Sequence, residues 1–156
     1  MPTTLVSKKS RHRMLPASGQ AQGVARGIVE SMPGVAEHPD LLFAGQLLAS
    51  ELAGNAVRHA APATAESILL VVECDGDTLH LEVVDDGPGF DPLGMLVRHE
   101  RSNEPYHGIV LVNALSDRWG FRRADEGMCV WFELDLVPGR RPWRGRDPVH
   151  VRRPGA

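Results

Sequence analysis

Two polar side chains of complementary chemistry lie one helical turn apart in the run SELAGNAVRHA. At about 100° per residue, Glu51 and Asn55 lie side by side at the edge of the apolar stripe of a predicted helix over 40–60. An amide oxygen is a ligand that Mg²⁺ accepts, and a carboxylate one turn away is suited to serve as a general base. The alternative is a solvated helix edge with an ordinary i,i+4 pair, because charged residues are mostly exposed.

Two basic side chains follow a further turn along the same helix. Arg58 and His59 are candidates to face phosphate groups, although a surface role fits either residue alone.

A carboxylate ends the alternating strand TLHLEVVD. Leu79, Leu81, Val83 and Asp85 share one face of this strand, so Asp85 is directed at the interface between layers. The glycines of the following Asp-Gly-Pro-Gly-Phe-Asp run, at 87 and 89, permit positive φ and close approach of a ligand. A carboxylate in this position can accept a hydrogen bond from an exocyclic amine and thereby select adenine over guanine. A plain Asp-Gly turn is the alternative.

The remaining pattern predicts the elements that position these residues. We expect helices over 21–31, 40–60 and 108–117, strands over 67–74, 78–84, 119–123 and 128–137, and a candidate lid over 87–106. Helices before and between antiparallel hairpins predict an α+β fold, a two-layer sandwich with helices on one face of a mostly antiparallel sheet.

Length and composition set the outer limits. A chain of 156 residues suits one domain, predicted over 14–137, with a flexible arm over 1–13 and a disordered basic Pro/Gly/Arg tail over 138–156. The net charge of −3 argues against a protein that grips nucleic acid along its whole surface. Cys74 and Cys129 are too few and too far apart for a zinc cluster and predict buried free thiols. No apolar run is long enough to span a membrane, so we expect a cytoplasmic protein.

The order of these motifs resembles the superfamily of gyrase, chaperone, histidine-kinase and mismatch-repair ATPases. SELAGNAVRHA is similar to its N-box, VVDDGPGF to its first glycine box and YHGIVLVNALSDRWG to its second. The runs ARGIVES and DRWG resemble the small bacterial anti-sigma-factor serine/threonine kinases in particular. The likeness covers about 14–137 and implies a Bergerat-type ATP-binding fold with ATP and Mg²⁺ as cofactors.

The resemblance also implies roles for single residues. Glu51 is the expected catalytic base, Asn55 the Mg²⁺ ligand and Asp85 the reader of adenine. Orphan N–H groups at a helix start favour phosphate oxygens, which supports a phosphate contact at Gly108. The full set of expected ATP-binding residues is Asn55, Arg58, His59, Asp85, Gly87, Gly89, His107, Gly108 and Ile109.

Three functions remain compatible with the sequence. The first is an anti-sigma factor that phosphorylates an anti-anti-sigma protein, with a sigma factor as second partner and a homodimer as a possible assembly. The second is a non-catalytic module, ATP-binding or nucleotide-free, that sequesters a sigma factor or another regulator, which the departures from the family pattern at Tyr106 and Met128 favour. The third is the detached ATP-binding half of a histidine kinase, although the chain lacks a long dimerisation hairpin. Direct binding of nucleic acid rests only on the basic tail.

Overall fold

The computed structural model describes residues 8–59, 68–102, 108–124, 127–137 and 149–151. In chain order the elements are β1 (Lys9–Leu15), α1 (Gln20–Ser31), α2 (Pro39–His59), β2 (Ile68–Cys74), β3 (Thr78–Asp85), α3 (Pro92–Glu100), α4 (Ile109–Leu115), β4 (Arg118–Ala124), β5 (Gly127–Asp135) and β6 (Val149–Val151).

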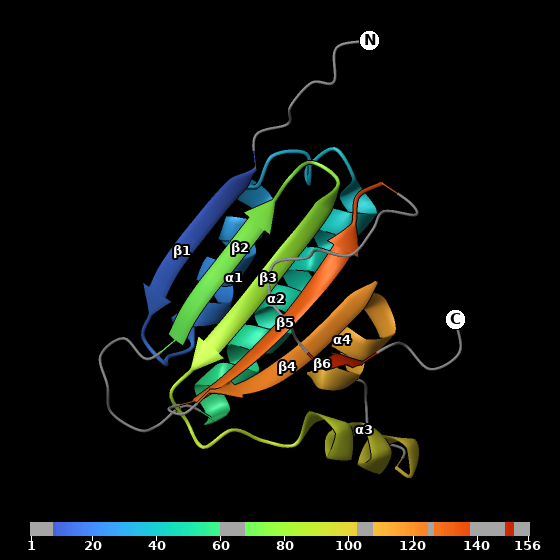
Figure 1. The fold of residues 1–156 in the computed structure, drawn as a ribbon. Helices are drawn as coiled ribbons and strands as arrows, with labels where there is room; N and C mark the ends of the chain where they lie inside the picture. The colour runs from blue at the N-terminus through green and yellow to red at the C-terminus, as the bar shows by residue number, and fades with distance from the viewer. Residues whose placement is uncertain (1–7, 60–67, 103–107, 125–126, 138–148, 152–156) are drawn as a thin grey trace.

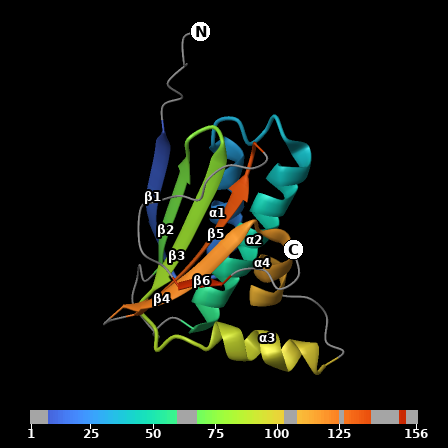
Figure 2. The same ribbon diagram turned by 45° about the vertical axis from the view of Figure 1, so that its right-hand side comes forward.

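The strands form one antiparallel sheet with the order β1-β2-β3-β5-β4-β6. Helices α1 and α2 cover one face of this sheet, as Figures 1 and 2 show from two sides. The predicted α+β two-layer sandwich is therefore confirmed. Among the described residues, no helix is long and apolar enough to cross a membrane.

Local chemistry explains the central hairpin. The Asp75 carboxylate accepts hydrogen bonds from the backbone N–H groups of Asp77 and Thr78, both at 2.9 Å, and Gly76 supplies a φ of 91°. This is the side-chain-stabilised turn that Asp and Gly favour. It fixes the register between β2 and β3, and so places Asp85 at the end of β3 opposite Ile68.

Helix α2 packs closely against the sheet and against α1. A Cβ at Gly45 would lie 3.2 Å from side-chain atoms of both Leu79 and Val29, so a glycine here allows α2 to approach both the sheet and α1. Leu48 and Leu52 are 0% and 1% exposed and fill the space between α2 and the sheet. This close packing determines how far Glu51 and Asn55 lie from the sheet.

The first strand extends into the region that the sequence predicts as a flexible arm. Residues 9–13 pair with β2 as part of β1, in register from Lys9 opposite Cys74 to Leu15 opposite Ile68. Sequence patterning does not show this strand because only Leu15 is buried. Backbone hydrogen bonds to β2 hold an edge strand whose side chains need no apolar alternation. Similarly, Val149–Val151 of the predicted tail pairs with β4, whereas 138–148 and 152–156 lie outside the described residues.

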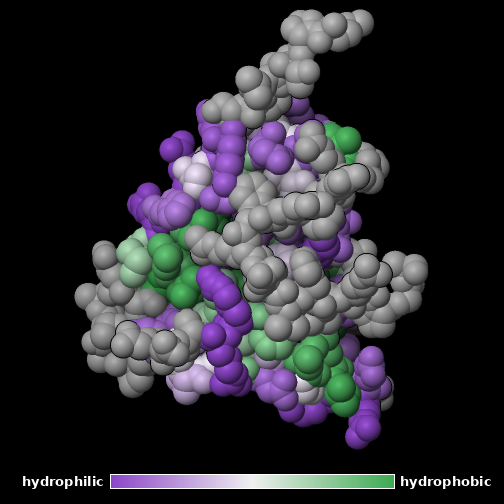
Figure 3. Space-filling model, viewed as in Figure 1, coloured by the Kyte–Doolittle hydropathy of each residue, from purple (hydrophilic) through white to green (hydrophobic). Residues whose placement is uncertain are grey.

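A helix occupies part of the predicted lid. The Asp91 side chain accepts from the Gly94 N–H at 3.0 Å and caps α3, with Pro92 in its first turn. Asp-Pro is a helix-start signal that could have indicated this element. Helix α3 packs against α4 but leaves Leu93 and Val97 43% and 48% exposed. A hydrophobic area is visible at the lower right of Figure 3, near the end of the molecule where Figure 1 places α3.

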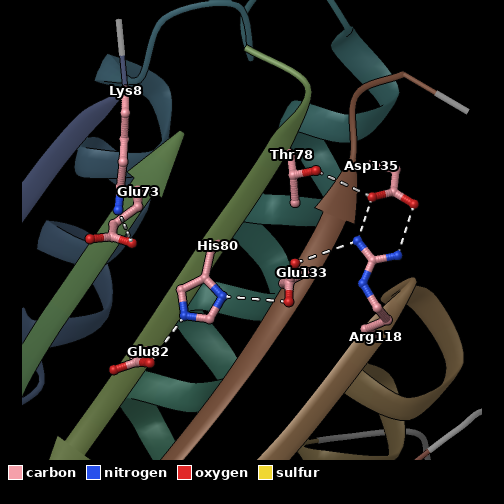
Figure 4. Close-up of polar contacts among 8 residues, drawn as sticks. All are labelled: Lys8, Glu73, Thr78, His80, Glu82, Arg118, Glu133 and Asp135. Atoms are coloured by element: carbon pink, nitrogen blue, oxygen red, sulfur yellow. Dashed lines mark hydrogen bonds and ion pairs between the residues drawn. The ribbon is translucent and has the colours of Figure 1, made fainter. Parts of the chain in front are cut away.

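The opposite face of the sheet carries a polar row (Figure 4). His80, Glu133 and Arg118 face one another across β3, β5 and β4. His80 Nε2 lies 3.1 Å from Glu82 Oε1, and its Nδ1 lies 3.8 Å from Glu133 Oε1. Arg118 forms ion pairs with Glu133 and Asp135. These side chains tie three strands together by charge rather than by apolar contact.

Candidate nucleotide site

Glu51 links α2 to the start of α4. Its Oε2 accepts a hydrogen bond from the backbone N–H of Gly108 at 2.9 Å. Gly108 has a φ of 53°, and a Cβ there would lie 3.1 Å from both Oδ1 and Nδ2 of Asn55. The residue before α4 must therefore be glycine, both for its backbone conformation and for its approach to the Asn55 amide.

Asn55 is buried beside Glu51 and is only 2% exposed. Its Oδ1 accepts a hydrogen bond from Arg58 Nη2, and its Nδ2 has no hydrogen-bond partner among the described residues. A buried amide N–H without a partner costs about 1–3 kcal/mol. The Oδ1 atom faces a cationic group and the Nδ2 atom is available to an acceptor, an arrangement that fits a metal ion and an anionic ligand at this point.

Asp85 lies at the opposite end of the site, 6% exposed at the end of β3. Its Oδ1 accepts from the backbone N–H of Gly87 at 2.8 Å. Burial raises the pKa of this carboxyl above its usual value, and the Gly87 hydrogen bond only partly opposes that rise. The carboxylate is thus partly desolvated, and a donor that reaches it gains more than it would in water.

The glycine-rich loop that follows Asp85 is held by aromatic and sulfur contacts. The His59 ring stacks on Phe90 with centroids 4.8 Å apart. Gly89 has a φ of 79°, and a Cβ there would lie 3.2 Å from Met128 Sδ. His59, a candidate phosphate contact by sequence, therefore lies against the loop beyond Asp85.

The predicted site residues fall into two groups joined by α2. Glu51, Asn55, Arg58 and Gly108 meet around the start of α4, whereas His59, Asp85, Gly87 and Gly89 belong to the loop end. Ile109 is completely buried in the hydrophobic core, which leaves only its backbone for a ligand contact. His107 lies outside the described residues.

Sequence reasoning missed two residues that shape the loop end. A Cβ at Gly127 would lie 1.8 Å from the Asp85 carbonyl oxygen, so the start of β5 can approach β3 only with glycine there. Arg123 donates to the carbonyl oxygens of Pro88 and Phe90. Neither role has a local sequence signal, because both depend on the pairing of β5 with its neighbours.

No cluster of three or more His, Cys, Asp or Glu side chains arranged for a metal ion occurs in the part of the chain that the structure describes. Any Mg²⁺ here would rely on Asn55 together with ligand oxygens, as is usual for an ion that keeps several waters and takes few protein ligands. Both cysteines are buried free thiols, as predicted.

The model of the histidine kinase-like ATPase domain family matches residues 16–134. The chain belongs to this family. Membership confirms the superfamily resemblance and, with it, the expectation of an ATP-binding domain. The family match covers all of the site residues described above, from Glu51 to Met128.

A solved structure gives the same fold. The chain matches the crystal structure of the RsbU and RsbW domains of Rv1364c from Mycobacterium tuberculosis with a TM-score of 0.59 and 19% identity. The match covers 81% of this chain and 32% of that one. At this identity the likeness concerns the fold. No curated protein matches the chain.

Proposed function

We propose that this histidine kinase-like ATPase domain binds Mg²⁺·ATP and transfers the γ-phosphoryl group to a serine or threonine of a regulatory protein. The observation that carries the proposal is the buried Asn55 amide, with its partnerless Nδ2, one turn from the Glu51 carboxylate and against Gly108. A buried donor without a partner is a poor structural feature and a good ligand contact.

Each residue then has a separate task. Asn55 Oδ1 would hold the metal ion, which supplies positive charge that offsets the phosphates. Arg58, which now bonds that oxygen, would be released toward the phosphate oxygens. Glu51 would accept the proton of the attacking serine or threonine hydroxyl. The hydroxyl oxygen would then bond to the γ-phosphorus while the bond from that phosphorus to the bridging oxygen of ADP breaks. The Asp85 carboxylate would accept a hydrogen bond from the adenine amine.

The regulatory setting follows from the resemblance of ARGIVES and DRWG to anti-sigma kinases and from the RsbW domain named in the solved neighbour. We infer a cytoplasmic anti-sigma factor that holds a sigma factor and phosphorylates an anti-anti-sigma protein. These partners are proposals because the chain matches only a third of that neighbour and shares 19% identity with it.

A binding module without catalysis is the second candidate. In the structure Glu51 already accepts a hydrogen bond from Gly108, and Arg58 already donates one to Asn55. The polar groups of the site therefore largely satisfy one another's hydrogen-bonding capacity. This arrangement is compatible with a protein that sequesters a partner without nucleotide chemistry.

The deciding experiment uses purified protein, ATP labelled at the γ-phosphate and the regulatory proteins encoded beside its gene. We expect Mg²⁺-dependent label on a serine or threonine of one neighbour. Capture of a sigma factor without any transfer of label would support the binding module and remove the kinase.

A further inference from the structure

Three residues on neighbouring strands lie next to the glycine-rich loop: Asp85, Met128 and Arg123. In the sheet register Asp85 on β3 lies opposite Met128 on β5, and Met128 lies opposite Arg123 on β4. All three are at the end of their strands from which the loop 86–91 departs. Asp85 and Met128 are buried, whereas the Arg123 side chain is exposed and adds nothing to the core.

Two of these residues engage both backbone polar groups of Phe90. The Met128 Sδ accepts from the Phe90 N–H at 3.4 Å. Arg123 Nη2 donates to the Phe90 carbonyl at 3.2 Å, and its Nη1 reaches the Pro88 carbonyl at 3.5 Å. The His59 ring, at the end of α2, stacks on the Phe90 ring. Phe90 is therefore held from β4, β5 and α2 at once.

Holding the loop in one conformation has a thermodynamic consequence. The run Asp-Gly-Pro-Gly-Phe contains two glycines, which lose more conformational freedom on ordering than other residues. If the loop were ordered only when a ligand arrives, that entropy cost would weaken binding. A planar guanidinium is well suited to bridge two carbonyls, because its donors form a rigid fork.

We propose that Arg123 is a positioning residue for nucleotide binding: together with Met128 it fixes Phe90 and so keeps the loop from Asp85 to Gly89 in the conformation that receives the adenine ring of ATP. The inference rests on the proposed nucleotide function and deepens it. It also gives Met128 a task, since its sulfur accepts a hydrogen bond from the loop at the Phe90 N–H.

The test compares Arg123→Ala and Arg123→Lys with Arg122→Ala. Arg122 is the neighbouring arginine on β4, but its side chain points to the other sheet face and pairs with Glu82. For each full-length protein, amide hydrogen exchange of 86–91 is measured without nucleotide, Mg²⁺·ATP affinity by calorimetry, and global stability by urea unfolding.

For Arg123→Ala we expect exchange across 86–91 to accelerate about tenfold and the Kd for ATP to rise about tenfold, the size of one to two lost hydrogen bonds. The urea midpoint should stay close to wild type. Arg123→Lys should give an exchange rate and a Kd between those of Arg123→Ala and wild type. Its ammonium keeps the positive charge but lacks the paired donors of the guanidinium. Arg122→Ala should change neither the exchange of the loop nor the affinity.

Met128→Leu provides an independent variant with nearly the same volume and no sulfur acceptor, and it should raise the ATP Kd in the same direction. Wild-type exchange rates or ATP affinity in Arg123→Ala would overturn the positioning role, as would an equal effect of Arg122→Ala. If wild-type protein binds no ATP, the proposed function fails and this inference fails with it. If wild type binds and Arg123→Ala binds equally well, only the positioning role is lost.

Discussion

At the scale of single residues, Glu51 separates an enzyme from a protein that only binds ATP. A general base is needed only when phosphate moves, so Glu51→Ala should keep ATP affinity within a fewfold and lose about 10²–10⁴-fold in phosphoryl transfer. Asn55→Ala should weaken both binding and transfer. Nucleotide affinity by calorimetry and phosphate incorporation by gel, on the same preparations, measure the two effects.

The structure suggests a control for the Glu51→Ala variant. Glu51 also accepts the Gly108 N–H, so Ala removes an interhelical hydrogen bond as well as a base. Glu51→Gln keeps an acceptor for that N–H but cannot take up a proton. Transfer should be lost equally in Gln and Ala. Near-normal transfer in the Gln variant would show that the carboxylate acts only as a link between α2 and α4.

Asp85 is expected to set base preference. The protein should bind Mg²⁺·ATP in preference to Mg²⁺·GTP, because the carboxylate accepts from the adenine amine and opposes the guanine carbonyl. Asp85→Ala should cost about 1.5–3 kcal/mol of ATP binding, typical for a lost hydrogen bond to a charged group. Calorimetry with both nucleotides measures this, with the exposed neighbour variant Asp86→Ala as control. Equal affinity of wild type for ATP and GTP would remove the adenine-reading role.

At the scale of elements, the segment 91–106 combines a short capped helix with a polar continuation. Helix α3 is held by its packing on α4 and leaves two apolar side chains, Leu93 and Val97, exposed. We expect limited proteolysis to cut first in 91–106, because Pro92 is the only buried residue among 91–102, and 103–106 lie outside the described residues. Saturating Mg²⁺·ATP should slow that cutting if the segment closes over the phosphates. Unchanged cleavage would favour the binding module.

At the scale of the whole molecule, the polar row on the outer face makes stability depend on pH. Burial lowers the pKa of His80, but the hydrogen bonds that its ring donates to the carboxylates of Glu133 and Glu82, together with the charges of these carboxylates, outweigh burial, so the pKa lies above its ordinary value. A raised pKa stabilises the fold fully below the unfolded value of about 6.5, and the stabilisation is lost as pH rises through the folded value. The free energy of unfolding should therefore fall on the alkaline side of about pH 6.5.

His80→Gln tests this dependence. The variant should be less stable at acidic pH, and its urea midpoint should vary less between the acidic and alkaline sides of the His80 titration. His12→Gln, at an exposed position on β1, is the matched control. If the urea midpoint of His80→Gln varies with pH as it does in wild type, a group other than His80 causes the pH dependence of stability.

The sequence by itself determined the features that repeat with a fixed period or sit in a local signal. The alternation of Leu79, Leu81 and Val83 defined β3 and the direction of Asp85, and the Asp-Gly-Asp turn fixed its hairpin. The helical spacing of Glu51 and Asn55 placed both on one edge of α2. Each of these features depends on residues that are close in sequence, within one or two helical turns or one hairpin, where local backbone geometry determines which side chains share a face.

Only the tertiary structure decided what meets across long separations. β1 is a strand because its backbone pairs with β2, although its side chains carry no pattern. Gly127 and Arg123 reach the loop after Asp85 because β5 inserts between β3 and β4, an order that no local signal encodes. Likewise, the bond from Gly108 to Glu51 depends on how α4 docks against α2. Side-chain periodicity records which face is buried, whereas partners across a sheet or between helices are chosen by the packing of the whole domain.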